Sequence, residues 1–209
     1  MLMIATEDEL SERVACKIAM EASVKGEDIE CVGRKGSGYL RRKIGDFAQV
    51  ARRRPVLVLT DLDDVKCAPS LCRQWMGETM RERSVLFRVA VREIEAWLLA
   101  DRKAMAMFLG VSSAKIVKDT QTIGDPKRYL LNLAKFAPAS LKADLLPRPG
   151  VRAAQGFGYN SRLGAFVESD WCSKRACENN SSLRKTVVRL KAYLADFDSR
   201  TYRPKESRT

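Results

Sequence analysis

Short apolar runs alternate with helix-like patterns over the first half of the chain. The runs cover residues 2–6, 29–32, 56–59 and 84–91, and a segment with helical spacing of apolar residues follows each of them. Strands that alternate with helices predict a parallel sheet with helices on both faces and right-handed crossovers. We therefore expect an α/β fold, a Rossmann-like, mostly parallel four-stranded sheet.

The helix patterns of this half are amphipathic. One ends at Ala22, two cover residues 40–51 and 68–80, and the last begins at Arg92. In the last pattern the apolar residues form one continuous stripe, which predicts a single long helix with its tryptophan in the core; the stripe consists of Ile94, Trp97, Leu98, Met105 and Phe108.

The second half of the chain is predicted to be helical. Beyond Gly110 no comparable strand pattern occurs, and helices are expected to begin at Ser112, Asp125 and Ser182. The patterns divide the chain into an α/β core over residues 1–110, a helical C-terminal extension packed on it over residues 111–198, and a disordered polar tail over residues 199–209. Two irregular connections, residues 138–150 and the aromatic and cationic loop of residues 156–162, interrupt the helices.

Carboxylates follow the ends of two expected strands. The apolar run 56–59 leads into Asp61 and Asp63, and Glu7 follows the first strand. Residues two apart on a strand share a face, so Asp61 and Asp63 are expected roughly 6–7 Å apart. Carboxylates held this close need a cation, and oxygen ligands suit Mg²⁺ or Mn²⁺. Glu95, near a helix start, could face the same site.

A structural interpretation of these acidic residues stays open. Asp61 and Asp63 could simply end a strand and begin a turn, as Asp often does. Glu95 could be an ordinary acidic residue in the first turn of a helix, where the helix dipole favours it.

A glycine-rich loop over residues 33–39 carries two cations, Arg34 and Lys35, and leads into a helix with Arg41 and Arg42 near its start. Free backbone N–H groups in such a loop could bind a phosphate. A flexible surface turn explains the same composition, and the loop lacks the Walker pattern.

Charge favours a polyanionic partner. Lys and Arg number 38 against 26 acidic residues, which gives a net charge of +12 and makes nucleic acid, DNA or RNA, the first candidate. Many basic proteins bind no polyanion, so charge alone does not decide. The chain has no histidine, which excludes histidine general bases, Ser-His-Asp triads and histidine-containing zinc sites.

The six cysteines allow two interpretations. Two pairs have four residues between them, Cys67 with Cys72 and Cys172 with Cys177, so a four-thiolate zinc site is conceivable. Free or buried thiols are favoured, because structural zinc pairs usually have tighter spacing.

Neither a transmembrane run nor a signal sequence is evident. No apolar stretch reaches the length of a membrane span, and the N-terminus lacks a basic region before it turns acidic at Glu7. We expect a cytoplasmic, unprocessed protein without a membrane partner.

The ordered carboxylates resemble those of the Toprim domain of topoisomerases, primases and OLD-type nucleases. In that family a glutamate follows the first strand and an Asp-x-Asp follows the third, as Glu7, Asp61 and Asp63 do here. The Arg-Glu-Ile-Glu-Ala-Trp stretch from Arg92 is similar to a later motif of a bacterial Toprim-like subgroup, many members of which are uncharacterised and some linked to phage defence. Three further segments resemble the same subgroup, so that the resemblance covers roughly residues 2–195: they are Gly36 to Leu40, Asp125 to Lys127 and Gly158 to Asn160.

The resemblance implies a Toprim-like fold and a metal-dependent phosphodiesterase or nuclease. Glu7, Asp61, Asp63 and Glu95 would bind Mg²⁺ or Mn²⁺. We expect Lys35 or Lys127 to stabilise charge during catalysis, and we expect nucleic-acid contacts from cations and one tyrosine: Arg34, Lys35, Arg41, Arg42, Tyr159 and Arg162. Asp8 stands where Toprim domains usually have Gly, and a second carboxylate beside Glu7 would repel phosphate unless it binds metal or points away. The alternative is a Toprim-shaped module that binds nucleic acid or a protein encoded nearby, without turnover.

Overall fold

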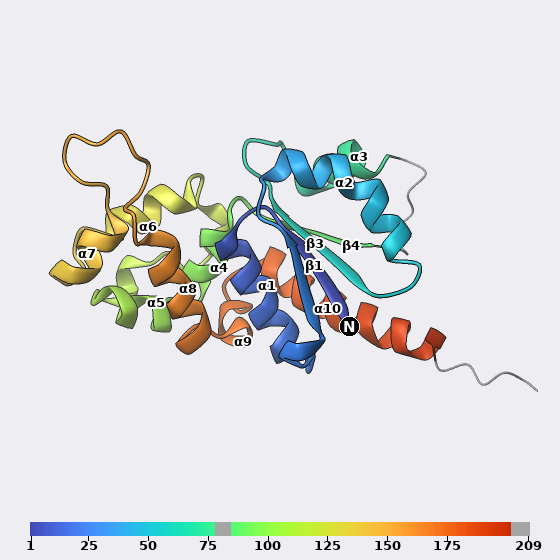
Figure 1. The fold of residues 1–209 in the computed structure, drawn as a ribbon. Helices are drawn as coiled ribbons and strands as arrows, with labels where there is room; N and C mark the ends of the chain where they lie inside the picture. Colours follow the sequence, from blue (N-terminus) through green and yellow to red (C-terminus); the bar gives the residue numbers. More distant parts are fainter. Residues whose placement is uncertain (78–84, 202–209) are drawn as a thin grey trace, which may run out of the picture.

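The computed structural model describes residues 1–77 and 85–201. In these ranges β1 (Leu2–Thr6), β2 (Ile29–Gly33), β3 (Val56–Asp61) and β4 (Leu86–Ala90) form one sheet in the order β2-β1-β3-β4 (Figure 1). All three strand pairs are parallel. The predicted four-stranded parallel sheet is therefore confirmed; residues 78–80 of the expected third helix and Ser84 of the expected fourth strand lie outside the described ranges.

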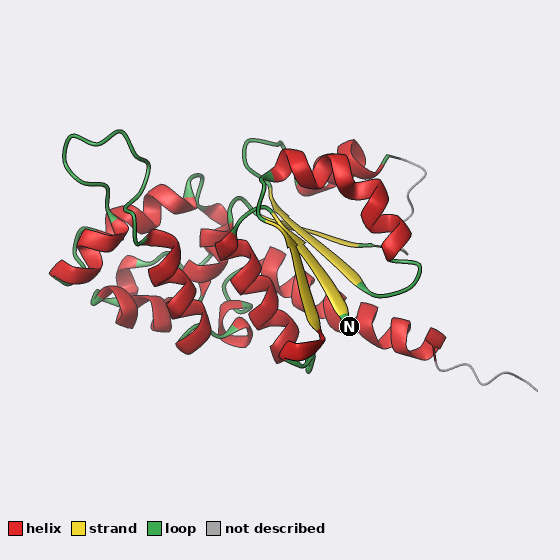
Figure 2. Ribbon diagram, in the orientation of Figure 1, coloured by secondary structure: helices red, strands yellow, loops and turns green. Residues whose placement is uncertain are grey.

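Helices cover both faces of the sheet (Figure 2). Alternate residues of the central strands face opposite sides, so each face has its own core. The face of Ile4 and Leu59 packs with α1 (Glu9–Glu21), and the face of Ala5 and Val58 packs with α2 (Ser37–Val50) and α3 (Ala68–Met76). Because β1 and β3 are buried on both faces, their sequences are continuous apolar runs, as parallel strands require.

The chain between β4 and Gly110 folds into two helices, α4 (Ile94–Ala100) and α5 (Arg102–Leu109), and the prediction of one continuous helix is wrong. The break is at Asp101, whose ψ of 70° leaves the helical region. Its side chain accepts a hydrogen bond from the Ala104 backbone N–H and caps α5. Trp97 is fully buried, as expected.

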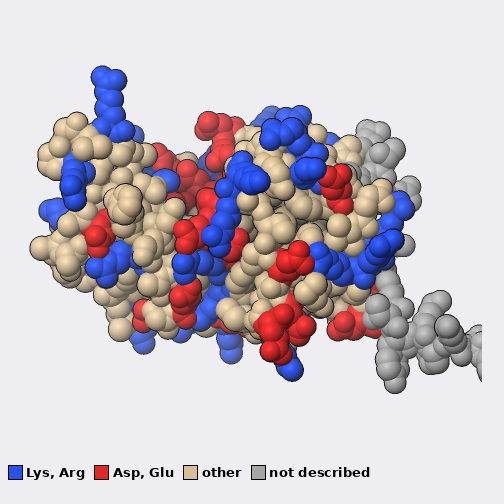
Figure 3. All heavy atoms as spheres, in the orientation of Figure 1, with Lys and Arg blue, Asp and Glu red and all other residues tan. Residues whose placement is uncertain are grey.

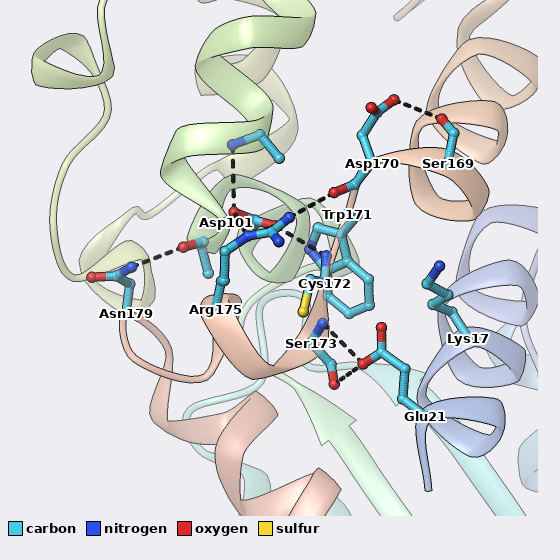
Figure 4. A network of polar contacts seen from close by, with 12 residues as sticks. Lys17, Glu21, Asp101, Ser169, Asp170, Trp171, Cys172, Ser173, Arg175 and Asn179 are labelled. Atoms are coloured by element: carbon cyan, nitrogen blue, oxygen red, sulfur yellow. Dashed lines mark hydrogen bonds and ion pairs between the residues drawn. The ribbon is translucent and has the colours of Figure 1, made fainter. Parts of the chain in front are cut away.

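Asp101 also binds the C-terminal part of the chain to the junction of α4 and α5 (Figure 4). Its carboxylate accepts hydrogen bonds from the Cys172 N–H at 3.0 Å and from the Arg175 Nη2 at 2.7 Å, so that α9 (Ser173–Ala176) lies against α4. Glu21 of α1 accepts hydrogen bonds from the backbone N–H and the hydroxyl of Ser173. The carboxylate of Asp101 thus joins three helices.

The C-terminal extension is helical, as predicted, but two of its helices were not predicted. An irregular connection was expected over residues 138–150, and it contains α7 (Ala139–Leu145); a loop was expected over residues 156–162, where α8 (Tyr159–Ser169) begins. Both helices pack into one continuous core with α1, β1 and β3. The extension also contains α6 (Pro126–Ala134), α10 (Ser181–Thr201) and two short 3₁₀ turns, η2 (Ser113–Lys115) and η3 (Thr120–Thr122). A third 3₁₀ turn, η1 (Gly26–Asp28), precedes β2.

The last helix is longer than expected. The pattern predicted an end at Leu194, whereas α10 reaches Thr201 and includes three residues of the tail that was predicted to be disordered. The rest of that tail, residues 202–209, lies outside the described ranges. Over residues 1–77 and 85–201, no helix has the length and hydrophobicity needed to cross a membrane.

Candidate functional site

The carboxyl ends of β1, β3 and β4 bring three acidic residues together. Glu7 follows β1, Asp61 ends β3 beside Ala90 of β4, and Glu95 lies in the first turn of α4 just after β4. Parallel strands place ligand sites at this edge. In Figure 3, acidic atoms form a band down the middle of the visible face, with basic atoms on both sides of it.

Glu7 is oriented by the end of the neighbouring strand. Its Oε1 accepts hydrogen bonds from the Thr60 hydroxyl and from the Asp61 backbone N–H, the latter at 2.9 Å. Burial raises the pKa of Glu7, and these two donors oppose the shift. The other carboxylate oxygen, Oε2, accepts no hydrogen bond from the described residues.

Asp61 is the least satisfied carboxylate of the site. Its Oδ1 is buried and has no hydrogen-bond partner among the described residues. Burial raises the pKa of Asp61 well above its ordinary value, and the negative charges of Glu95 and Glu7 raise it further. A buried charged oxygen without a donor is costly, so this group requires either a proton or a cation.

Glu95, whose negative charge acts on Asp61, is 4% exposed. Its Oε1 accepts a hydrogen bond of 2.9 Å from the Tyr159 hydroxyl. Burial raises the pKa of Glu95 to about 7, although the Lys127 ammonium and the Tyr159 hydroxyl favour the ionised form. The acidic residue predicted at a helix start therefore faces the interior, where the sequence left its orientation open.

Tyr159 has a different role from the one predicted. It is 1% exposed and cannot stack on a nucleic-acid base, so its expected place on the nucleic-acid surface is wrong. Phe157, two residues earlier, is fully exposed. Tyr159 is the first residue of α8, and its buried hydroxyl donates a hydrogen bond to Glu95.

Lys127 is held beside this cluster by a residue that the sequence interpretation missed. Asp125 caps α6 and Pro126 occupies its first position, as expected. Glu93 Oε2 then accepts a hydrogen bond of 2.9 Å from the Lys127 backbone N–H, and the Lys127 Nζ lies 5.2 Å from the centre of the Tyr159 ring. The signal for Glu93 was its position immediately before the helix that carries Glu95.

Asp63 does not continue the strand, so the expected alternation with Asp61 is wrong. Strand β3 ends at Asp61, and Asp63 has a φ of +48°, in the left-handed region that Asp tolerates in turns. The N–H groups of Leu62 and Asp63 donate to the Arg92 carbonyl, which fixes the turn against the segment after β4. Asp63 is exposed at the mouth of the site.

Asp8 is explained by the fold. Its side chain accepts a hydrogen bond of 2.8 Å from the Ser11 N–H and caps α1. The residue is exposed, and its charge still contributes to the raised pKa values of Glu7 and Asp61. Asp8 therefore has a structural role while adding to the negative field.

Three of the predicted nucleic-acid contacts already have partners in the chain. Arg34 forms an ion pair with Glu12, Arg162 forms one with Asp144 at 2.6 Å, and the Lys35 Nζ lies 5.4 Å from the centre of the Tyr39 ring. Arg41 and Arg42 are exposed on α2.

The glycine-rich loop packs against the end of β1. The N–H of Arg34 donates to the Thr6 carbonyl, and the N–H of Gly36 donates to the Glu7 carbonyl. Gly33 has a φ of +114°, and a Cβ there would lie 2.2 Å from the Thr6 oxygen, so the sequence requires glycine. Two of the N–H groups that could bind phosphate are thus already used.

The donor chemistry of the cluster fits a hard cation, but its geometry is incomplete. Oxygen-only carboxylates and the unpartnered Asp61 Oδ1 are what Mg²⁺ or Mn²⁺ requires. Over residues 1–77 and 85–201, however, no three acidic or cysteine side chains are close enough together to hold one metal ion.

The cysteines form no such group either. Cys67 is the N-cap residue of α3 and Cys72 lies in the middle of that helix, whereas Cys172 and Cys177 flank α9. All six are free thiols. The described thiols that come close are a pair the spacing did not single out, Cys16 of α1 and Cys31 of β2, with sulfurs 3.3 Å apart.

Comparison with known proteins adds no assignment: neither a family model, nor a curated protein, nor a solved structure matched the chain.

Proposed function

We propose that the protein is a Mg²⁺- or Mn²⁺-dependent phosphodiesterase that acts on nucleic acid, with its site at the carboxyl ends of β1 and β3. The observation that carries the proposal is the buried Asp61 Oδ1, which has no donor within residues 1–77 and 85–201 and has two carboxylates as neighbours. A structural aspartate is normally satisfied by N–H groups. A cation would neutralise Asp61 and Glu7 together.

Asp61 and Glu7 would hold the cation, and Asp63 and Glu95 would add their negative charge to the site. When bound, the cation would supply an activated water and neutralise charge on the scissile phosphate. Thr60 keeps Glu7 oriented, and Tyr159 keeps Glu95 in place. The net charge of +12 favours association with a polyanion.

Cleavage of labelled single- and double-stranded DNA and RNA by the purified full-length protein tests this proposal. We expect cleavage with Mn²⁺ or Mg²⁺, loss of cleavage in EDTA, and loss of cleavage in Asp61→Asn. The control is the variant Asp46→Asn, which should cleave as the wild type does. Asp46 is an exposed residue of α2 that pairs with Lys43. Cleavage by Asp61→Asn at the wild-type rate would exclude this site.

The second candidate is a module that binds nucleic acid or a protein without turnover. The incomplete metal geometry favours it, because the described side chains alone do not converge on one ion. In that case Asp61 and Glu95 would keep protons instead of a cation. Salt-sensitive nucleic-acid binding that is equal in wild type and Asp61→Asn, with no cleavage of any substrate, would identify it.

A further inference from the structure

A cavity of about 360 Å³ opens beside the carboxylate site, between α3, β4 and the first turn of α10. Its size is in the range of small-ligand sites. The residues that line it include four cations, Lys66, Arg88, Arg92 and Lys185, and no aspartate or glutamate. The carboxylate site and this cavity therefore have opposite charge.

Three of these cations have no carboxylate partner within the described parts of the chain. Arg92 Nη1 donates to the Asp63 carbonyl at 2.9 Å, and neither Lys66 nor Lys185 forms an ion pair there. In contrast, Arg13, Arg34, Arg54, Arg162 and Arg175 elsewhere in the fold each pair with a carboxylate. Unpaired cations around one cavity repel each other and would be stabilised by an anion.

Side chains, rather than the backbone N–H groups at the start of α10, would contact an anion in the cavity. The Ser182 N–H at the start of α10 donates to the Gln121 Oε1, and the Leu183 N–H donates to the Asn180 Oδ1. These first N–H groups are therefore occupied. Cations that remain available for hydrogen bonds suit the oxygens of a phosphate.

Arg92 connects the cavity to the carboxylate site. Its guanidinium lines the cavity and donates to Asp63, and its own carbonyl accepts from the N–H groups of Leu62 and Asp63. A polynucleotide strand with one phosphate at the carboxylates could thus place a neighbouring phosphate in the cavity.

The thiol of Cys67 lies at the cavity, and its reactivity depends on the charges there. Cys67 lines it at the start of α3, and a hydrogen bond with Ser70 together with the positive charges of Arg73 and Lys66 lowers the pKa of that thiol. Thiolates react fastest with alkylating agents, so Cys67 can be used as a probe.

We propose that this cavity is a phosphate-binding subsite for the nucleic-acid strand, with Lys66, Arg92 and Lys185 as its phosphate contacts. The inference rests on the proposed function for the identity of the ligand. Inorganic phosphate and nucleotides carry the same chemistry, so the test compares them with an oligonucleotide.

The test measures binding in EDTA, where cleavage cannot contribute. The probe is a fluorescent ten-nucleotide single strand, and the variant is Lys66→Gln/Lys185→Gln, two exposed positions that leave the core intact. We expect at least about tenfold weaker binding at low salt and a loss of roughly 1.4 from the salt slope, about 0.7 per phosphate contact. Lys118→Gln/Lys142→Gln removes the same charge at exposed sites outside the cavity and should bind as the wild type does.

Alkylation of Cys67, followed by mass spectrometry of each cysteine, gives a second readout. The oligonucleotide should slow it in wild type and not in the lysine variant. Unchanged affinity, salt slope and Cys67 alkylation would overturn the subsite even if the protein cleaves nucleic acid. Protection by phosphate or a nucleotide, with none by the oligonucleotide, would overturn the nucleic-acid assignment. Binding and protection without cleavage in Mn²⁺ would support the subsite and refute the proposed hydrolysis.

Discussion

Two aspartates of this fold, each with a buried carboxyl oxygen, have opposite surroundings. Asp101 is 1% exposed, and its carboxylate accepts hydrogen bonds from the N–H groups of Ala104 and Cys172 and from the guanidinium of Arg175. Asp61 has one carboxyl oxygen that receives no hydrogen bond from the described part of the chain, and its neighbours include Glu7 and Glu95.

The difference in hydrogen-bond donors indicates that Asp101 has a structural role, whereas Asp61 is held in surroundings that disfavour its ionised form. Asp101 is compensated within the chain, so its charge stabilises the junction of α4, α5 and α9. Asp61 costs stability in the protein alone, and such sites are maintained where the strain serves binding or catalysis. Removing the charge should therefore have opposite effects at the two positions.

Asp101→Asn should give the largest effect. It keeps an oxygen for the Ala104 N–H but removes the charge that pairs with Arg175, and it brings a new NH₂ group into a site of donors. We expect a loss of about 3 kcal/mol in the free energy of unfolding, reduced from the fully buried case because Arg175 is half exposed. Urea denaturation measures it, and a loss below about 1 kcal/mol would show that the pair is not structural.

The pH dependence of stability should reveal the carboxylate cluster. The pKa of Glu95 is about 7 in the folded protein against an ordinary value of 4.5, so between these pH values the folded state keeps a proton that the unfolded chain releases. This contribution is fully present below pH 4.5 and is lost as the pH rises through 7, by up to about 3 kcal/mol. Glu95→Gln should remove the part of the decline that Glu95 causes and leave the part caused by the raised pKa values of Glu7 and Asp61.

A bound cation should reverse the same decline. Mg²⁺ or Mn²⁺ that binds only the folded state stabilises it by mass action and favours the ionised carboxylates. Unfolding curves at pH 7.5 with and without metal measure the effect. Equal stability in both conditions would contradict cation binding at this site.

Asp61→Asn should stabilise the metal-free protein by about 1 kcal/mol at neutral pH, because the Asp61 carboxyl must either stay ionised beside Glu7 and Glu95 or take up a proton, whereas the amide avoids both costs and adds an NH₂ donor. The same variant should lose the stabilisation by metal. Thermal unfolding in EDTA and in Mn²⁺ measures both effects, with Asp46→Asn as the control. A clear loss of stability in EDTA would make Asp61 structural and remove the contrast with Asp101.

The sheet and its acidic edge were predictable from sequence because both depend on local patterns. Continuous apolar runs identify strands buried on both faces, and parallel topology places Glu7 and Asp61 at one edge. Asp63 was misplaced because the period of two was extended past the end of β3. The positive φ that ends the strand depends on the contact with Arg92, which is distant in sequence.

The partners of the site were less predictable. Tyr159 follows a glycine-rich, cationic segment, which resembles an exposed loop, and its burial depends on α8 packing against α1 and α7. Asp101 lies in a helical pattern, and its break is stabilised by residues more than 70 positions away. Long-range polar contacts leave little local signal, so the roles of these residues required the structure.

Tyr159→Phe should give the smallest effect and tests how the cluster is held. The phenol donates to Glu95, and removal of this donor should lower stability by about 1 kcal/mol. Because the hydrogen bond favours ionised Glu95, its loss should raise the pKa of Glu95 further and move the decline in stability to higher pH. Stability curves from pH 4 to 9 are compared for Tyr159→Phe and Tyr129→Phe. The Tyr129 hydroxyl bonds to the backbone of Lys115 and Val117, so the comparison separates this coupling from a general loss of packing. An identical pH profile for Tyr159→Phe and wild type would mean that Tyr159 only fills space, and that Glu95 is held by burial alone.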